Sequence, residues 1–473
     1  MIEVLKIIYM VLFCCTFVFV AYNLILMVIG LLPRKRKYKL IEDSQKFCIF
    51  VPCHNEGSVI GATVENLSKI VYDRNLFDVY FIADNCSDNT ADEIRKAIKE
   101  LGTSNFNCFE RHVDDPKKKG KPHALKWAIE KLEEEDKFYN KYDMFMILDA
   151  DNFVDADILK HMNSQYLSYP EKKRPELIQC YLDSKNKNSI IARGYYTTYR
   201  IMNGFWQYPK TRIGLNACIG GTGFSMTTKF LKEIGGYNCS SLTEDLEIQT
   251  IATLKNRRIL FNQFARIYDE KPTGLKQSMV QRTRWAQGHW FICFKYTWRL
   301  FLSLFNFKQI KMIFKKLDNM LYLLGMFNIT CTFLMLLINL GISISNAIYK
   351  IWGIGELYEF NVIPPTLYTV SIISSIVFYC IILLSSIYDG DKKEKKFALL
   401  EVIPNIISLL IFSFTYFPPA IIGLFKCPNQ KTWKKTAHKV TKIAHKDNLL
   451  LQDENTKTEE ISEELKMEDV SNN

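Results

Sequence analysis

Apolar residues are unevenly spread along the chain, and the first concentration lies at the N-terminus. The run from Ile7 to Leu32 contains no Asp, Glu, Lys or Arg. At about 1.5 Å of rise per residue, a helix of this length exceeds the roughly 30 Å of hydrocarbon in a bilayer. The run lacks the short apolar region and the cleavage site of a secretory signal, so residues 1–33 are predicted to form a transmembrane anchor.

A cluster of basic residues follows this run and predicts its orientation in the membrane. The cluster consists of Arg34, Lys35, Arg36, Lys37 and Lys39. Because positively charged flanks stay in the cytoplasm, the chain after the anchor is predicted to be cytoplasmic. Basic residues beside apolar runs also indicate contact with the anionic headgroups of a lipid bilayer.

Three more apolar runs predict about three membrane segments within residues 317–425. The runs are Asn319–Tyr349, Leu367–Tyr388 and Phe397–Phe425. Together with the anchor they indicate a multi-pass protein of the cell membrane. Three crossings would leave the C-terminus outside the cell, whereas the lysines after the last run favour the cytoplasm.

Prolines in the last run would resolve this conflict between the two predictions for the side of the C-terminus. Pro404 and the pair Pro418 and Pro419 interrupt helical hydrogen bonding. We therefore interpret this run as a re-entrant or partly interfacial segment. Residues 426–473 would then form a cytoplasmic tail that is basic at first and acidic afterwards.

Between about Phe47 and Thr273, short apolar runs alternate with segments of helix length. This alternation predicts an α/β domain with a mainly parallel sheet over residues 46–275. The predicted strands are Phe47–Val51, Val79–Ala83, Asn107–Arg111, Met144–Leu148 and Leu177–Leu182. The predicted helices are Ser58–Ile70, Ala91–Leu101, Ala124–Leu132 and Asp155–Tyr166.

Polar side chains collect after three of these strands, at the edge where open α/β sheets bind ligands. The sequences there are Pro52-Cys53-His54-Asn55-Glu56, Asp84-Asn85-Cys86-Ser87-Asp88 and Asp149-Ala150-Asp151-Asn152. Helix capping by Asp88 or Asn89 explains one such cluster as well as ligand binding does. Three clusters at one edge favour a binding site.

Asp149 and Asp151 carry the most specific chemistry of these clusters. Two carboxylates one residue apart suit a divalent cation with oxygen ligands, and such a cation can bridge a diphosphate. Lys121 follows three other lysines and precedes a predicted helix. Its ammonium group either meets phosphate charge or lies in a solvated loop, and both interpretations remain open.

Two later motifs extend the candidate site. Glu244 and Asp245 open a predicted helix, where acids are also favoured by the helix dipole. Further along, residues 276–316 are predicted to form interfacial helices that contain Arg284 and Trp285. These two residues suit either an amphipathic helix at the membrane surface or the recognition of a diphosphate and a sugar ring.

Composition supports this division of the chain and excludes other protein classes. The 473 residues carry a net charge of +11 and are 48% hydrophobic, with a mean hydropathy of −0.05. That mean is an average over apolar segments, a polar domain and a charged tail. The 13 cysteines show no zinc-binding spacing and indicate reduced, buried thiols. No nucleic-acid partner is predicted, because no segment resembles a nucleic-acid-binding module.

In this order, the motifs resemble those of the family-2 glycosyltransferases, specifically the membrane-integrated synthases of cellulose, chitin, hyaluronan and poly-N-acetylglucosamine. The series is Pro-x-x-Asn-Glu, an Asp-containing turn, Asp-x-Asp, Thr-Glu-Asp and Gln-x-x-Arg-Trp. The resemblance covers nearly the whole chain. It implies a cytoplasmic GT-A-like (Rossmann-like) domain together with transmembrane and interfacial helices.

The resemblance also implies roles for residues on the donor side. Lys121 would reach the base or the diphosphate, and Asp149 would face the donor sugar and the ribose. Asp151 would bind Mg²⁺ or Mn²⁺, and Arg284 would hold the diphosphate leaving group. The residues implied to line the base and ribose are Pro52, Asn55, Glu56 and Asp84.

On the acceptor side, the resemblance implies that Asp245 is the general base and that Trp285 stacks on the acceptor end. The usual second motif is Asp-Asp-Gly-Ser-x-Asp, and Ala83 replaces its first Asp here. Asp84 aligns with the second Asp, so the exact contacts of the base stay open. The other residues implied to bind the acceptor are Thr222, Gly223, Glu244 and Gln281.

The resulting hypothesis is an inverting, processive glycosyltransferase that elongates a β-linked polysaccharide at the membrane and exports it. A UDP-sugar is the expected donor, with UDP-glucose favoured over UDP-N-acetylglucosamine. Direct attack by the acceptor needs one side-chain base and inverts the anomeric carbon. The alternative is a non-processive enzyme that adds one sugar to a lipid-linked acceptor, because four membrane segments are few for a channel. A homo-oligomer or an accessory subunit stays open.

Overall fold

The computed structural model describes residues 2–115, 118–135, 138–306, 312–352, 380 and 395–430. Apart from Cys380, the predicted membrane run Leu367–Tyr388 lies outside these residues. The same holds for the predicted tail beyond Gln430.

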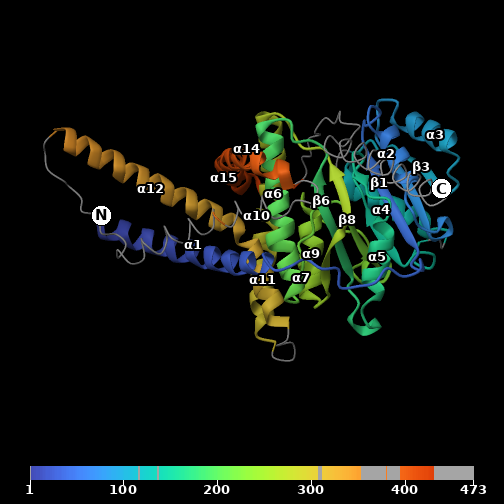
Figure 1. The fold of residues 1–473 in the computed structure, drawn as a ribbon, viewed down its shortest axis with the longest axis horizontal. Helices are drawn as coiled ribbons and strands as arrows, with labels where there is room; N and C mark the ends of the chain where they lie inside the picture. The colour runs from blue at the N-terminus through green and yellow to red at the C-terminus, as the bar shows by residue number, and fades with distance from the viewer. Residues whose placement is uncertain are drawn as a thin grey trace, which may run out of the picture.

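A single eight-stranded sheet forms the centre of the large domain (Figure 1). Its strands lie in the order β3-β2-β1-β4-β7-β6-β8-β5. The first four strands of this order are parallel, β7 is antiparallel to both of its neighbours, and β5 is antiparallel to β8. The strands are β1 Phe47–Cys53, β2 Phe77–Asp84, β3 Phe106–Arg111, β4 Met144–Ile147, β5 Phe153–Val154, β6 Leu177–Ser184, β7 Phe224–Thr227 and β8 Ile259–Asp269. The predicted α/β domain with a mainly parallel sheet is thus confirmed.

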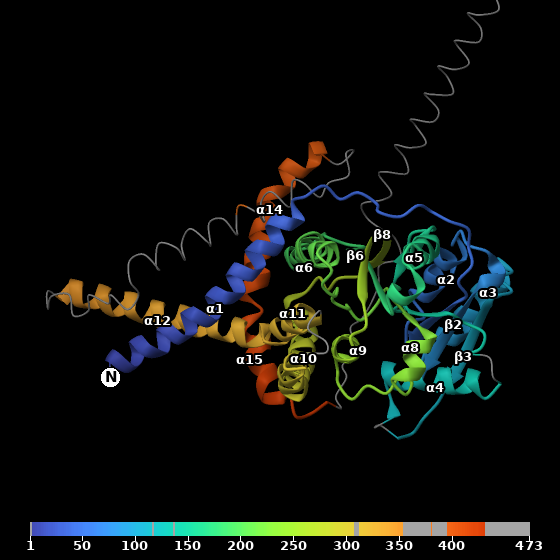
Figure 2. The same cartoon turned by 90° about the horizontal axis from the view of Figure 1, so that it is seen from below.

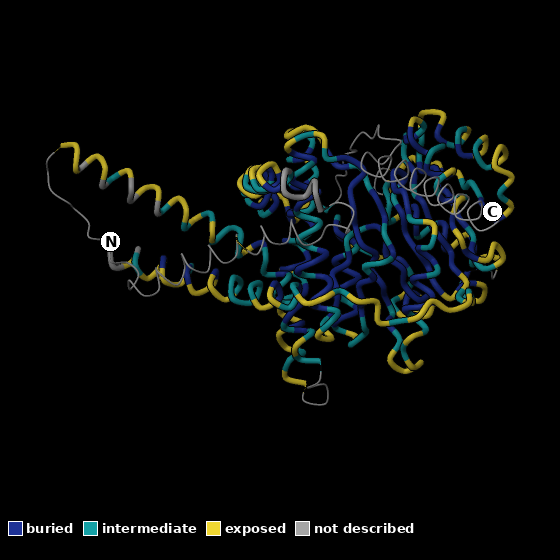
Figure 3. The backbone as a smooth tube through the Cα atoms, in the orientation of Figure 1, coloured by how far each residue is buried: buried dark blue, intermediate teal, exposed yellow. Residues whose placement is uncertain are grey.

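Helices cover both faces of this sheet, which explains why its strands are apolar on both sides. In β1, Phe47, Ile49 and Val51 pack against one layer, and Cys48 and Phe50 pack against the other. The domain's helices are α2 Ile60–Ser68, α3 Thr90–Leu101, α4 Lys121–Glu133, α5 Ile158–Leu167, α6 Ile190–Met202, α7 Tyr208–Arg212, α8 Thr228–Glu233 and α9 Glu244–Leu254. Figure 3 shows the sheet as the most continuously buried part of the chain.

Three-residue 3₁₀ helices and one π-helical turn connect these elements. The 3₁₀ helices are Arg74–Leu76 and Glu171–Lys173, and the π-helical turn is η4, Asn203–Gln207, between α6 and α7. The turn η4 contacts the N-terminal helix, so it links the domain to the first apolar run.

The remaining helices lie on one side of the domain and include the predicted membrane segments. Helices α1 and α12 run side by side away from the domain (Figure 1), while α14 lies against α6 and α15 against α10 (Figure 2). These helices are α1 Ile2–Gly30, α10 Leu275–Leu304, α11 Ile313–Leu323, α12 Gly325–Trp352, α14 Lys395–Phe414 and α15 Phe417–Lys426.

Two stretches of the described chain are long and apolar enough to cross a membrane, namely Lys6–Gly30 and Glu401–Lys426. There is a third candidate span if α11 and the first part of α12, which meet at an angle of 47°, are counted as one segment. The last predicted run is interrupted at one of the two expected places, because α14 ends at Phe414 and α15 begins at Phe417, just before Pro418 and Pro419. The interruption expected at Pro404 is wrong, because this proline lies inside α14. Whether this interrupted segment is re-entrant stays a prediction.

A buried ion pair attaches α1 to the domain. The Nζ of Lys210 in α7 lies 2.9 Å from the carboxylate of Asp318 in α11, and the two side chains are 1% and 4% exposed. The hydroxyl of Tyr22 in α1 donates to the same carboxylate. Because a buried charge needs its partners, this contact fixes where α1 lies against the domain.

Two glycines allow a matched test of the sheet. Gly223, directly before β7, has φ +60°, and a Cβ there would lie 2.5 Å from the Cδ1 of buried Ile267. Gly235 has φ +84° and open space around its Cβ position. Gly223→Ala should therefore lower the thermal unfolding midpoint clearly more than Gly235→Ala, which carries only the backbone strain of about 1–2 kcal/mol. Equal midpoints for the two variants would contradict this packing.

Candidate active site

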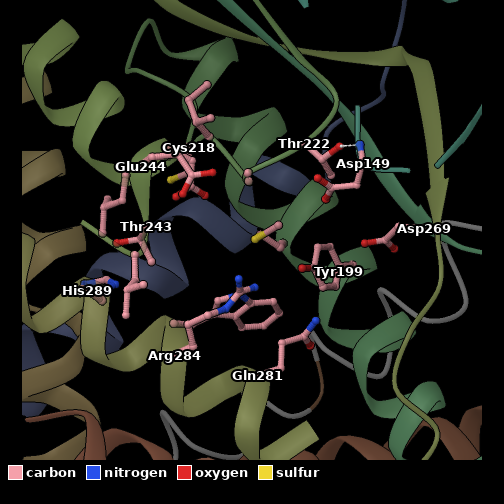
Figure 4. A pocket seen from close by; sticks show the side chains of 18 of the residues that line it. Asp149, Tyr199, Cys218, Thr222, Thr243, Glu244, Asp269, Gln281, Arg284 and His289 are labelled. Atoms are coloured by element: carbon pink, nitrogen blue, oxygen red, sulfur yellow. Dashed lines mark hydrogen bonds between the residues drawn. The ribbon is translucent and has the colours of Figure 1, made fainter. Parts of the chain in front are cut away.

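A cavity of about 760 Å³ opens at the carboxyl ends of β1, β2 and β4, where ligands of such sheets bind. Its wall continues over α9 and α10 and onto the apolar helices α1, α12 and α14. Figure 4 shows side chains from these sides pointing toward one another. The cavity therefore joins the edge of the sheet to the candidate membrane segments.

Asp84 ends β2 and lies within a buried polar cluster. Its carboxylate is 2.6 Å from the guanidinium of Arg111, which ends β3, and the two side chains are 8% and 6% exposed. The backbone N–H of Gly120 and the side-chain amide of Asn85 also donate to Asp84, at 3.2 and 2.8 Å. Arg111 donates in turn to the carbonyl of Lys118 at 2.7 Å. The ion pair thus connects the turn after β2 to the loop that leads into α4.

The turn after β1 depends on Asn55, which adopts the left-handed conformation with φ +55°. Its side-chain oxygen accepts a hydrogen bond from the N–H of Ser87 at 2.7 Å. The cavity is lined by the neighbouring residues Pro52, His54 and Glu56, whereas Asn55 supports the turn from behind them. Asn55 therefore shapes this wall of the cavity through the turn, and its contact with a donor stays a prediction.

Lys121, the first residue of α4, crosses the cavity toward the acidic residues. Its Nζ lies 2.5 Å from Oδ1 of Asp149 and 2.8 Å from the carbonyl oxygen of Gly221. Burial opposes the ammonium charge, but the carboxylates of Asp149, Glu244 and Asp245 outweigh it and raise the pKa of Lys121. Lys121 therefore stays protonated and connects the acidic turn after β4 with the loop that leads into β7.

Thr222 and Asn152 hold the turn that carries Asp149. The N–H of Asp149 donates to Oδ1 of Asn152 at 3.0 Å. It also donates to Oγ1 of Thr222 at 3.1 Å (Figure 4). Thr222 lines the cavity and orients this carboxylate. Gly223, in contrast, donates its N–H to the carbonyl of Ile147 at 2.9 Å and lies behind the cavity wall. We therefore assign no acceptor contact to Gly223.

Asp151 and Asp269 form the acidic end of the cavity. Asp151 is 5% exposed, and its Oδ2 accepts a hydrogen bond from the N–H of Glu270 at 3.0 Å. Asp269, at the end of β8, lies 2.5 Å from the Nζ of Lys271. Burial raises the pKa of Asp269 to about 6, the charge of Lys271 opposes this shift, and the charge of Asp151 adds to it.

These carboxylates fit a hard divalent cation, which binds oxygen ligands. In the part of the chain that the structure describes, no three His, Cys, Asp or Glu side chains converge on one metal position. Mg²⁺ or Mn²⁺ would thus be held by Asp151, with neighbouring Asp269, and would need further oxygen ligands from a diphosphate. Burial and the neighbouring charge of Asp151 raise the pKa of Asp269, and a cation bound beside it would favour its ionised form.

Glu244 and Asp245 begin α9 and face the cavity from the opposite side. The helix start is anchored by Glu247, which accepts hydrogen bonds from the N–H of Ser240 at 2.8 Å and from Lys295 at 2.7 Å. Burial, reinforced by the charge of Glu244, raises the pKa of Asp245 to about 7. A carboxylate with a pKa near neutrality is suited to accept a proton as a general base.

Helix α10 supplies the remaining wall of the cavity through residues spaced three or four positions apart. Gln281, Arg284, Trp285 and His289 all line the cavity, and Figure 4 shows three of them rising from this helix. The indole of Trp285 packs edge to face against Tyr195 at 6.0 Å. The predicted motif therefore presents an amide, a guanidinium, an indole and an imidazole along one helical face.

Other side chains of α10 bind backbone oxygens of α14 and α15. Arg282, which is fully buried, donates to the carbonyl of Phe412 at 2.8 Å and to Oγ1 of Thr415 at 3.0 Å. The indole N–H of Trp290 donates to the carbonyl of Ala420 at 2.9 Å. Helix α10 thus holds both pieces of the interrupted C-terminal segment while its other residues face the cavity.

Three further residues of the candidate site were not predicted from the sequence, although a feature of the sequence indicated two of them. Arg111 ends a predicted strand, so the rule that selected Asp84 would also have selected it. Asp269 ends β8, a strand that was not predicted. His289 follows Trp285 by one helical turn, and helical spacing alone indicates the same face. The cavity brings together all the predicted site residues except Asn55 and Gly223.

Arg111 allows a test of the buried pair. Arg111→Met leaves the Asp84 carboxylate buried without its cation, which typically destabilises a protein by about 3–5 kcal/mol. We expect a lower thermal unfolding midpoint and weaker binding of UDP. Arg95→Met is the control, because Arg95 is half exposed and pairs with Glu110 at the surface, where such pairs contribute about 0–1 kcal/mol. Equal behaviour of the two variants would contradict the role of Arg111.

Comparison with known proteins places this site in a family. A model described as "Glycosyltransferase like family 2" matches residues 44–288. The poly-beta-1,6-N-acetyl-D-glucosamine synthase of Staphylococcus aureus is 27% identical over 252 residues, covering 52% of this chain and 55% of that protein. A probable glycosyltransferase of Bacillus subtilis is 21% identical over 281 residues, covering 58% and 61%. The chain thus spans about half the length of the curated relatives it matches.

One solved structure matches most of the fold. A mannosyltransferase from Pyrobaculum calidifontis, in complex with GDP-Man and Mn²⁺, covers 86% of this chain and 98% of its own, with a TM-score of 0.52 and 14% identity. The family match and this likeness confirm the GT-A-like fold that the motifs implied. Because the family model spans more than half of the chain, the protein belongs to glycosyltransferase family 2.

Proposed function

We propose that the protein transfers a sugar from a UDP-sugar to a hydroxyl group of a glycan acceptor, with inversion at the anomeric carbon. One observation carries the proposal. A single cavity combines the carboxylates after β4, the half-buried Asp245 at the start of α9 and the guanidinium and indole of α10. These groups would bind a charge-neutralising cation, accept a proton and contact the acceptor, and they lie on different walls of the same cavity.

The donor would bind at the sheet edge. Pro52, His54 and Glu56 line that wall, and the ion pair of Asp84 and Arg111 fixes the turn beside them. Lys121 and Arg284 supply positive charge near the diphosphate. When bound, a divalent cation supplies further positive charge to the departing UDP.

Asp245 would accept the proton of the attacking hydroxyl. Its pKa of about 7 leaves a substantial unprotonated fraction at neutral pH while keeping the carboxylate basic. Trp285 would orient the acceptor by contact between its indole face and a sugar ring, with Gln281 and Glu244 as polar neighbours. Attack from this side, opposite the diphosphate, converts an α-linked donor into a β-linked product.

The name of one relative favours a particular donor sugar within this proposal. The name of the Staphylococcus aureus relative specifies an N-acetyl-D-glucosamine polymer, which favours UDP-N-acetylglucosamine over the UDP-glucose expected from the motifs. We therefore propose elongation of a β-linked N-acetylglucosamine polymer at the membrane. Addition of one sugar to a lipid-linked acceptor is the second candidate, because the cavity reaches α1 and α12.

The domain would face the cytoplasm, where the basic residues after α1 meet the membrane surface. Lys35, Arg36, Lys37 and Lys39 are exposed directly after this helix. Positive charge at such a position keeps the adjoining chain on the cytoplasmic side. UDP-sugars would then enter the cavity from the cytoplasm. A homo-oligomer or an accessory subunit remains a proposal without further support.

A product assay tests this function. Protein in nanodiscs is incubated with labelled UDP-N-acetylglucosamine or UDP-glucose, with Mn²⁺ or with EDTA. We expect a high-molecular-weight, β-linked product from UDP-N-acetylglucosamine, and its loss with EDTA. Digestion with linkage-specific glycosidases identifies the bond. Single-sugar adducts on lipid would instead favour the second candidate, and no transfer from either donor would refute the function.

The raised pKa of Asp245 predicts the pH dependence. The base form exists above its pKa, so kcat/KM should rise about tenfold per pH unit below pH 7 and level off above it. Glu244→Gln removes a negative neighbour that raises this pKa, and should shift the midpoint of the rise to lower pH. Asp245→Asn should lose activity and still bind UDP. An unshifted midpoint in Glu244→Gln would contradict the coupling of the two acids.

A further inference from the structure

The junction of α11 and α12 forms part of the cavity wall. Helix α11 ends at Leu323, α12 begins at Gly325, and their axes differ by 47°. A helix end leaves carbonyl groups without partners in the next turn. Beside apolar helices such groups need another donor, because water is scarce there.

His289 of α10 supplies that donor. Its Nε2 lies 3.1 Å from the carbonyl oxygen of Tyr322 and 3.0 Å from that of Leu323. Both partners only accept hydrogen bonds, so Nε2 must carry the hydrogen. The imidazole thus binds the last two residues of α11 directly at the bend.

The protonation state of His289 agrees with this tautomer. Burial lowers the pKa of His289 to about 4, against the opposing effect of the two carbonyl groups. The ring is therefore neutral at physiological pH, with hydrogen on Nε2 and a free electron pair on Nδ1. A neutral donor such as a side-chain amide can replace it chemically.

Tyr322 connects this bend to the cavity. Its ring centroid lies 5.5 Å from the His289 ring and 6.3 Å from the Trp206 ring, in an edge arrangement with the indole. All three residues line the cavity, on the side near α1 and α12. The side-chain position of Tyr322 is fixed only if the end of α11 is fixed.

We propose that His289 is a positioning residue for the acceptor: by binding the carbonyl groups of Tyr322 and Leu323, it fixes the bend between α11 and α12 and sets the aromatic wall of Tyr322 and Trp206. The inference rests on the proposed function, because it requires an acceptor in this part of the cavity. Asp84 and Asp151 at the donor end belong to other elements, and Arg284, the residue of α10 nearest the diphosphate in the proposed function, precedes His289 by more than one helical turn.

Paired variants of His289 test the proposal in full-length protein in nanodiscs. His289→Leu removes the donor, and His289→Gln keeps a neutral N–H donor. The probes are UDP with Mn²⁺ for the donor end and a labelled N-acetylglucosamine oligosaccharide for the acceptor end. In His289→Leu, loss of the N–H donor that the two carbonyl oxygens share should raise the KM for the oligosaccharide by about tenfold and leave the Kd for UDP unchanged. His289→Gln should restore most of this loss.

Gln287→Leu is the matched control. Gln287 lies on the same helix and donates in the same way to a backbone carbonyl, that of Asn429, which does not line the cavity. Its loss should lower the thermal unfolding midpoint but leave the KM for the oligosaccharide unchanged. A general loosening of α10 would affect both variants alike.

The outcomes separate the two proposals. If the wild-type protein transfers sugar and His289→Leu retains the wild-type KM for the oligosaccharide, the positioning role is refuted. The same conclusion follows if the Kd for UDP and the KM change together, or if His289→Gln behaves like His289→Leu. Absence of transfer by the wild-type protein from either UDP-sugar would refute the proposed function, and the positioning role with it.

Discussion

The arrangement of this protein depends on backbone carbonyl groups that are left free where apolar helices end or bend. Such groups need hydrogen bonds even where water is scarce. One helix, α10, binds them: Arg282 donates to the carbonyl of Phe412 near the end of α14, and His289 donates to the carbonyls at the end of α11. Trp290 of the same helix also donates to the carbonyl of Ala420, which lies inside α15. The interrupted helices can therefore pack at fixed angles against the domain.

This constraint also determines what faces the substrates. Because α10 is fixed by its bonds to α11, α14 and α15, the residues on its remaining face are held over the end of the sheet. Arg284 and Trp285 thus lie opposite the carboxylates that follow β4. The position of the apolar helices and the geometry of the cavity are therefore set by the same helix.

Three carboxylates at the cavity each pair with a nearby cation. Lys121 pairs with Asp149, Arg111 with Asp84, and Lys271 with Asp269. Asp245 has Glu244 as its neighbour instead, and burial together with this like charge raises its pKa. A carboxylate with a raised pKa is what the proposed chemistry requires as a base.

The sequence predicted much of this protein, and the misses have physical reasons. Apolar runs identified β1 to β4 and β6, because strands buried on both faces are continuously apolar. The strands β5 and β7 are only two and four residues long, and β8 is interrupted at Asn262, whose side chain binds the backbone of Phe264 and Ala265. The motif residues were recognised by their types. Arg111, the partner of Asp84, was not predicted, because this pairing depends on β2 and β3 being neighbours in the sheet.

A cryo-electron microscopy structure in nanodiscs, with UDP, Mn²⁺ and a short N-acetylglucosamine oligosaccharide, tests the central claim that α10 joins two substrate sites in one cavity. The account predicts UDP beside Asp84 and Asp151, the terminal sugar of the oligosaccharide on Trp285 with a hydroxyl near Asp245, and the imidazole of His289 bound to the end of α11. An oligosaccharide bound away from α10, or a straight junction of α11 and α12 without the His289 contact, would contradict it.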